Sequence, residues 1–207
     1  ATIRTACAQL QEFLDHRGVR VRVEPGADVR IEPDMIRKIH DGEVLTLADH
    51  GRYVLLEMPH ELYFPLERLL RDLERSGMVG ILSHPERNQG VLAKPEVLGP
   101  LVDAGCLLQV TAASLMGTFG PRVRGLGEWL VREGLVHFVA TDAHGSKIRR
   151  PLMKQAHKRI TAIAGFRTAD ALCCENPARV VANREVAPGR HKPKPRAASW
   201  FRWRKAG

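Results

Sequence analysis

Four short apolar segments separated by helical patterns constrain the fold of this sequence more than any other feature. They span residues 53–56, 78–82, 106–110 and 136–140. Between and after them, apolar residues recur with the 3.6-residue period of helices, at 66–73, 97–104, 126–133 and 151–163. This alternation predicts parallel strands joined by right-handed helical crossovers. Strands that are apolar on both faces are typical of such sheets when helices cover them.

Polar residues stand at or just beyond the C-terminal ends of the predicted strands. They are Glu57, His84, Thr111 and Asp142. A parallel β/α barrel places its chemistry at that edge, and so does a doubly wound open sheet. The sequence contains no GxGxxG or GxxxxGKS loop, which argues against a nucleotide-binding open sheet. We therefore predict an α/β fold, a distorted, TIM-like parallel β/α barrel.

The N-terminal region departs from this pattern. Residues 3–14 predict a helix that stops at Gly18, and the alternation in Val19–Val23 predicts a strand before a loop opened by Pro25 and Gly26. A complete eight-unit barrel takes about 250 residues, whereas this chain has 207. Because the sequence begins in a helical pattern, without a preceding strand and without Met, we expect the barrel to be incomplete at the N-terminus.

The net charge of +9 is concentrated at the C-terminal end. Residues 186–207 contain seven basic residues, three prolines and no acidic residue. We therefore divide the chain into a domain at 1–185 and a basic, disordered tail at 186–207. Because the remaining body is nearly neutral, no nucleic-acid partner is expected for it.

The end of the tail, Trp200–Lys205, interleaves aromatic and basic side chains. This pattern favours an anionic membrane surface, where rings lie at the headgroup level beside cations. Stacking on single-stranded nucleic acid and a solvated tail without a partner are the alternatives. No apolar run approaches the roughly 18 residues that a membrane span requires.

The segment Ser83–Asn88 is the densest in reactive side chains. His84 precedes a proline at a strand end and can present its imidazole to a metal, and Arg87 offers a planar fork suited to phosphate. The alternative is a hydrogen-bonded loop histidine and a solvated arginine. His137 lies inside a predicted strand and is interpreted as structural.

Four further residues are candidate metal ligands. Asp142 and His144 leave a strand two residues apart, which suits a metal site or a capped turn. Glu57 interrupts an apolar context, so it is expected to bind a metal or pair with an arginine. Asp28 follows Pro25-Gly26 and is the weakest signal, since Asp is common in turns. Carboxylates with imidazole suit manganese, iron or zinc better than calcium.

Three segments carry a resemblance to a known family. They are His84–Asn88 (HPERN), Leu108–Gly120, and Ala140–His144 followed by Arg149–Pro151. Together they resemble the capsule-type (CpsB/YwqE-like) bacterial protein-tyrosine phosphatases. These are manganese-dependent members of the polymerase and histidinol phosphatase (PHP) superfamily, associated with capsule and exopolysaccharide synthesis. The resemblance runs from about Val21 to Ile163 and implies a PHP-type barrel.

The resemblance also implies roles for individual residues. The family's metal-ligand positions match Glu57, His84, Asp142 and His144, with Asp28 where the family usually has glutamate. Its phosphate-binding positions match Arg87 and Arg149, and Asp142 is expected to take part in catalysis as well. The family's N-terminal Asp-x-His-x-His motif does not occur in this sequence.

These observations lead to one main hypothesis and two alternatives. The main hypothesis is a cytoplasmic protein-tyrosine phosphatase in which two or three manganese ions, or iron or zinc, activate water. Its expected partner is the phosphotyrosine tail of a bacterial tyrosine kinase, with the enzyme peripheral at the inner face of the membrane. The alternatives are a small-molecule phosphoesterase of the histidinol-phosphatase type and a phosphotyrosine-binding module without activity.

Overall fold

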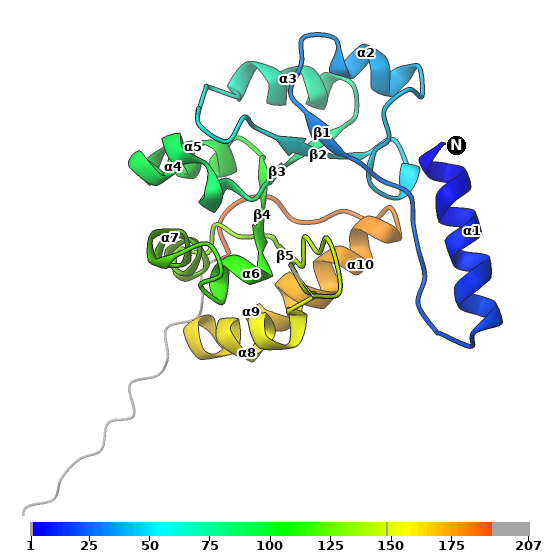
Figure 1. The fold of residues 1–207 in the computed structure, drawn as a ribbon. Helices are drawn as coiled ribbons and strands as arrows, with labels where there is room; N and C mark the ends of the chain where they lie inside the picture. Colours follow the sequence, from blue (N-terminus) through cyan, green and yellow to red (C-terminus); the bar gives the residue numbers. More distant parts are fainter. Residues whose placement is uncertain (1, 148, 192–207) are drawn as a thin grey trace, which may run out of the picture.

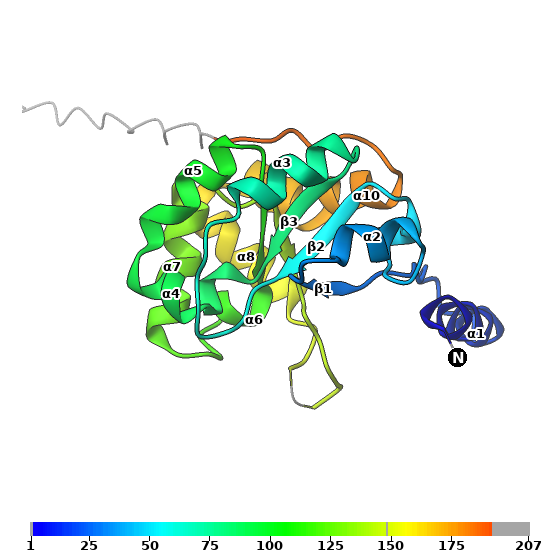
Figure 2. The same ribbon diagram turned by 90° about the horizontal axis from the view of Figure 1, so that it is seen from above.

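The computed structural model describes residues 2–147 and 149–191 and has a parallel sheet at its centre (Figures 1 and 2). Its strands follow one another in chain order: β1 (Asp28–Arg30), β2 (Tyr53–Glu57), β3 (Val79–Ser83), β4 (Leu107–Thr111) and β5 (Phe138–Ala140). Every neighbouring pair is parallel. The strand order does not reverse, as it would in a doubly wound sheet. The predicted α/β fold of parallel strands with helical crossovers is confirmed.

Helices surround this sheet, and five of the ten α-helices in the described residues lie where the periodicity predicts. They are α1 (Ile3–His16), α2 (Met35–His40), α3 (Glu67–Arg75), α4 (Gln89–Ala93), α5 (Leu98–Asp103), α6 (Ala112–Leu115), α7 (Pro121–Arg132), α8 (Met153–Ala164), α9 (Phe166–Asp170) and α10 (Asn176–Val181). A π-helical segment, Ala171–Glu175, joins α9 to α10. None of the helices in the described residues has the length and apolar character needed to cross a membrane.

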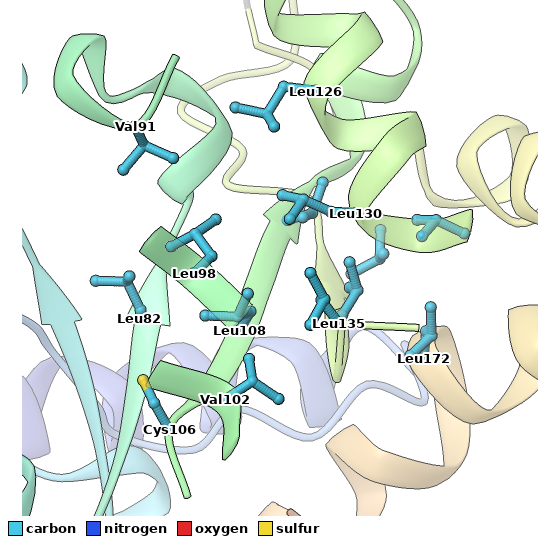
Figure 3. Close-up of a cluster of buried hydrophobic side chains, with 14 of the residues drawn as sticks. Leu82, Val91, Leu98, Val102, Cys106, Leu108, Leu126, Leu130, Leu135 and Leu172 are labelled. Atoms are coloured by element: carbon cyan, nitrogen blue, oxygen red, sulfur yellow. The ribbon is translucent and has the colours of Figure 1, made fainter. Parts of the chain in front are cut away.

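The main core lies between the sheet and α4, α5, α7 and α8. Leu82 of β3 and Leu108 of β4 pack there against Leu98 of α5 and Leu130 of α7, and all four are fully buried (Figure 3). Burial of each such side chain contributes about 2 kcal/mol relative to exposure. This packing fixes the strands whose C-terminal ends carry the polar residues.

A second apolar cluster covers the opposite face of the sheet. Tyr53, Ile81 and Phe138 pack there against Val180 of α10 and against Val186. The Tyr53 hydroxyl donates to the Arg184 carbonyl (2.8 Å) and accepts from the Val186 backbone N–H (3.0 Å). The C-terminal part of the described chain therefore closes this face.

These contacts correct the expected boundary of the tail. Val186 is buried in the second cluster, the backbone N–H of His191 donates to the Gly134 carbonyl (2.8 Å), and Arg190 forms an ion pair with Asp103 (3.0 Å). Residues 186–191 are therefore ordered and belong to the domain, not to a disordered tail. The rest of the expected tail, including Trp200–Lys205, lies outside the described residues.

The predicted strand at Val19–Val23 is wrong. This segment is not paired with any described strand, and Val19 and Val21 are exposed. Its backbone instead bonds the Gln11 side chain, which donates to the Val21 carbonyl (3.1 Å) and accepts from the Val23 N–H (2.8 Å). The alternating segment does not form a strand, because no described strand lies beside it with which it could form backbone hydrogen bonds.

Helix α1 ends where predicted but lies beside the body rather than within it (Figures 1 and 2). It has no buried residue, although its apolar spacing is helical. Arg4 connects it to the body through two hydrogen bonds to Asp49, of 2.6 and 3.0 Å.

Candidate metal and phosphate site

Three candidate ligands meet at the carboxyl edge of the sheet. Asp28 begins β1, Glu57 ends β2, and His84 follows β3. The His84 Nε2 atom lies 3.7 Å from Asp28 Oδ2 and 3.6 Å from Glu57 Oε1. One ligand atom from each residue falls within 4.8 Å of the other two. The sheet thus brings together residues that are far apart in the sequence.

The structure changes two details of the prediction. Asp28 lies on a strand rather than in a turn, because its neighbours pair with β2, with Asp28 opposite Leu55. Glu57 was expected to be buried, but its side chain is 42% exposed. It therefore faces the opening of the site and can reach a ligand from solvent.

A cavity of about 300 Å³ adjoins this cluster. It is lined by Glu57, Met58, His60, Ser83, His84, Arg87 and Asn88. Ser83 and His60 are residues that the sequence reasoning missed. The Ser83 hydroxyl donates to Asp28 Oδ2 (2.9 Å) and so orients this carboxylate. In the sequence, the position of Ser83 at the end of an apolar segment was the feature that could have indicated this role.

Burial and neighbouring charges shift the pKa values of Asp28 and His84 so that the neutral form of each is favoured. Burial, together with the nearby Glu57 and Asp142 carboxylates, raises the pKa of Asp28 to about 6, partly offset by the Ser83 hydrogen bond and by Arg87. Burial and the Arg87 charge lower the pKa of His84 below its usual value. A neutral imidazole beside two carboxylates is a favourable ligand set for a cation.

Asp142 lies between the two arginines. Arg87 Nη1 donates to Asp142 Oδ2 (2.7 Å), and Arg149 Nη2 donates to the same oxygen. The Arg87 guanidinium also stacks over the Phe119 ring, 4.6 Å from its centroid. Both arginine side chains are therefore held at one place, next to the cavity that Arg87 lines.

His144 is a predicted ligand that does not join the cluster. Its side chain is 58% exposed, and its Nδ1 atom lies 3.0 Å from the Asp142 carbonyl oxygen. The loop that carries it projects from the body after β5 (Figure 2). Among the described residues, the candidate ligand group contains neither Asp142 nor His144.

The backbone at three of these residues is unusual. His84, Asp142 and Arg149 have φ values of 33°, 46° and 51°, in the left-handed region that non-glycine residues rarely adopt. Such conformations cost about 1–3 kcal/mol each and gather at functional sites. Their concentration here supports the assignment of this edge as the site.

Glu86 is a third residue that the sequence reasoning missed. It lies between His84 and Arg87, is fully buried, and burial raises its pKa to about 7. Its Oε1 atom accepts from the Thr111 backbone N–H (2.9 Å) and from the Ser114 hydroxyl (2.7 Å). Glu86 thus ties the loop with both site residues to the start of α6. Its only sequence signal was a charge inside the HPERN segment.

The donor set of the cluster fits a transition metal. Two carboxylates and one imidazole converge on a common point, and this combination suits manganese, iron or zinc. Asp142 stands beside it but is engaged by both arginines. The site can therefore hold a cation on one side and an anion on the other.

Comparison with known proteins agrees with this geometry. The family described as "Capsular polysaccharide synthesis, CpsB/CapC" matches residues 1–182. The tyrosine-protein phosphatase YwqE of Bacillus subtilis is 35% identical over 151 residues, which cover 72% of this chain and 59% of YwqE. The tyrosine-protein phosphatase CpsB of Streptococcus pneumoniae is 28% identical over 162 residues, covering 75% of this chain and 66% of CpsB. The chain thus spans about three fifths to two thirds of these relatives' lengths.

A solved structure extends the likeness to three dimensions. It comes from work on crystal structures of YwqE and CpsB, which describes them as unique metal-dependent tyrosine phosphatases. The match has a TM-score of 0.86 at 30% sequence identity and covers 93% of this chain and 77% of the solved one. The five-stranded parallel sheet is therefore the PHP-type fold of these phosphatases. The chain belongs to the CpsB/CapC family.

Proposed function

We propose that this protein is a metal-dependent phosphomonoesterase that hydrolyses phosphotyrosine in proteins. One observation supports this most. The three-residue cluster Asp28, Glu57 and His84 stands at the same edge as two arginines that converge on one carboxylate. A cation site next to paired guanidinium groups is what hydrolysis of a phosphate ester requires.

The arginines bind the phosphoryl group. Arg87 and Arg149 are aligned by Asp142, and the remaining N–H donors of their guanidinium groups can take phosphoryl oxygens in a planar, bidentate manner. Phe119 keeps the plane of Arg87 fixed. Charge that develops on these oxygens during the reaction is stabilised by both guanidinium groups.

The ligand cluster would hold the metal. When bound, it supplies Lewis acidity and lowers the pKa of water toward neutrality. Asp28, Glu57 and neutral His84 would bind it, with Ser83 orienting the Asp28 carboxylate. Asp142 and His144 would complete the set. Manganese is the metal we propose, in two or three sites, with iron and zinc as alternatives.

The substrate class follows from the relatives. YwqE and CpsB are named tyrosine-protein phosphatases, and the family is described by capsular polysaccharide synthesis. We therefore propose the phosphotyrosine tail of a bacterial tyrosine kinase as the partner, in the cytoplasm at the inner face of the membrane. Residues 192–207 would contribute the contact with anionic lipid.

Turnover tests this proposal. The full chain, loaded with manganese, should release phosphate from a phosphotyrosine peptide faster than from histidinol phosphate. Glu57→Gln should lower kcat/KM by about a hundredfold or more, because it removes a charged ligand. Glu61→Gln, a matched change at an exposed glutamate nearby, should leave it unchanged. Tight binding of the peptide without turnover would instead support a binding module, and preference for histidinol phosphate would support the small-molecule alternative.

A further inference from the structure

Helices α7 and α8 form a basic surface that the proposed reaction does not use. Their basic residues are Arg122, Arg124, Arg132, Lys154, Lys158 and Arg159. Glu128 is the only acidic residue in either helix. The two helices pack against each other and both contact α6 (Figure 1).

Three of these arginines share the single carboxylate. Arg124 Nε lies 2.8 Å from Glu128 Oε1, and Arg159 Nη2 lies 2.6 Å from the same oxygen. Arg132 Nη2 donates to Glu128 Oε2 (2.9 Å). The Glu128 side chain is 9% exposed, whereas those of Arg124, Arg132 and Arg159 are 44%, 52% and 33% exposed. The arginines therefore surround a recessed anion and remain open to solvent.

The charges of this group do not balance. Although burial opposes it, the three guanidinium groups hold the pKa of Glu128 below its usual value, so it is ionised at neutral pH. One negative charge faces three positive ones, and no other carboxylate in the described part of the chain pairs with these arginines. The excess positive charge attracts further anions.

The basic group and the phosphate site share one loop. Arg124 packs on the loop between α6 and α7, where a Cβ atom on Gly117 would lie 3.6 Å from Arg124 Cδ. The same loop carries Phe119, whose ring stacks on Arg87. Arg87 and Arg124 thus contact the same loop, and Arg132 and Arg159 extend this row of cations along α7 and α8.

We propose that this row, which we call the basic track, binds acidic side chains that flank the phosphotyrosine of the substrate. The inference rests on the proposed function and adds the sequence class of the peptide. Carboxylates on residues that flank the phosphotyrosine would lie along α7 and α8, because an extended peptide advances about 3.3 Å per residue as it leaves the site. Arginine forks pair with carboxylates bidentately, which suits Asp and Glu side chains.

The recessed arrangement favours a peptide over a flat anionic surface. Arg159 is two thirds covered and lies against Glu128, so a side chain has to reach in to meet it. Single carboxylates on a flexible segment can do so, whereas lipid headgroups lie in one plane. We therefore assign the track to an acidic protein segment, and an anionic membrane is the contrary outcome of the test.

Peptide binding tests the proposal without requiring turnover. Fluorescence anisotropy would compare two labelled phosphotyrosine peptides, one flanked by Glu and one by Gln, on the full chain. The acidic peptide should bind about tenfold more tightly, with the advantage lost at high salt. The double variant Arg132→Gln/Arg159→Gln should remove that advantage and leave binding of the Gln peptide unchanged. Arg71→Gln, on the exposed face of α3, should change neither.

A second variant keeps the test independent of folding defects. Glu128→Gln removes the negative charge from the track, so it should tighten binding of the acidic peptide severalfold. Loss of a structural ion pair alone would not do this. Equal affinity for both peptides, or binding of anionic vesicles that requires Arg132 and Arg159 while peptide binding does not, would overturn the proposal. Hydrolysis of p-nitrophenyl phosphate with manganese tests the proposed function separately, because that substrate does not reach the track.

Discussion

Asp142 and the two arginines that it holds define the site at the scale of single residues. The sequence pattern identified all three. In the structure both guanidinium groups engage the Asp142 side chain, and its role as a metal ligand stays a prediction. Ser83 and Glu86 escaped prediction because their roles depend on partners 25 or more residues away, at Asp28, Thr111 and Ser114. Spacing along the chain does not reveal such contacts.

Replacing Arg87 by lysine should lower kcat/KM for a phosphotyrosine peptide about a hundredfold, the usual cost of removing one donor that stabilises developing charge. Lysine keeps the charge but loses the planar fork and the stacking on Phe119. Steady-state kinetics would measure this, with Arg71→Lys as the control. A loss of less than roughly threefold would show that Arg87 does not bind the phosphoryl group.

Glu86 should matter for stability through its two hydrogen bonds. Glu86→Leu leaves the Thr111 N–H and the Ser114 hydroxyl without an acceptor in the core, so the free energy of unfolding should fall by about 3 kcal/mol. Glu86→Gln keeps an acceptor oxygen and should cost less than half of that. Urea unfolding of both variants is the measurement. Equal stability of the leucine and glutamine variants would contradict the role.

At the scale of elements, the sequence predicts best where strands and helices are buried. The periodic segments around β2, β3, β4, α3 and α7 all form, because each buries its apolar residues in the clusters that cover the sheet. The alternation of Val19–Val23 fails because no strand lies beside it. Helix α10 went unpredicted because its buried Val180 packs against Phe138 and other distant residues.

His137 connects β5 with the C-terminal segment and makes folding depend on pH. Its Nδ1 accepts from the Leu108 N–H (3.1 Å), and its Nε2 lies 3.0 Å from the Gly189 carbonyl, so the imidazole is neutral. Burial and the nearby His191 lower the pKa of His137 to about 4. Because the folded pKa lies below the unfolded value, this stabilisation is complete above pH 6.5 and is lost as the pH falls toward 4.

The free energy of unfolding should therefore decrease by about 3 kcal/mol over this interval, over and above the effect of other groups. Urea unfolding at a series of pH values would measure it. His137→Gln should flatten the dependence, whereas His16→Gln on the exposed α1 should not. A wild-type curve as flat as that of His137→Gln would contradict the assignment.

At the scale of the whole molecule, the main core holds the strands whose C-terminal ends form the site. Leu108, in β4 between β3 and β5, is fully buried in the main core (Figure 3). The sequence predicted the parallel α/β arrangement and the functional edge, because these follow from periodicity and from which residues end each strand. It could not predict that Val186 helps to cover the opposite face, since that depends on Tyr53 and Val186 meeting across the molecule.

Truncating the Leu108 side chain should show how much the main core contributes to stability. Leu108→Ala leaves a cavity in a close-packed core and should lower the free energy of unfolding by about 3 kcal/mol. Leu62→Ala, at an exposed position, should change it by less than roughly 0.5 kcal/mol. Chemical denaturation of both variants provides the comparison. A similar small effect at the two positions would show that the core is not packed as described.

The central claim is that Asp28, Glu57 and His84 hold a metal beside Arg87 and Arg149. Its most direct test is an anomalous difference map from crystals of this chain grown with manganese. We predict a peak at about 2.0–2.3 Å from a carboxylate oxygen of Asp28, one of Glu57 and the imidazole of His84, and loss of that peak in His84→Ala. Manganese bound elsewhere, or bound here equally well in His84→Ala, would contradict this account.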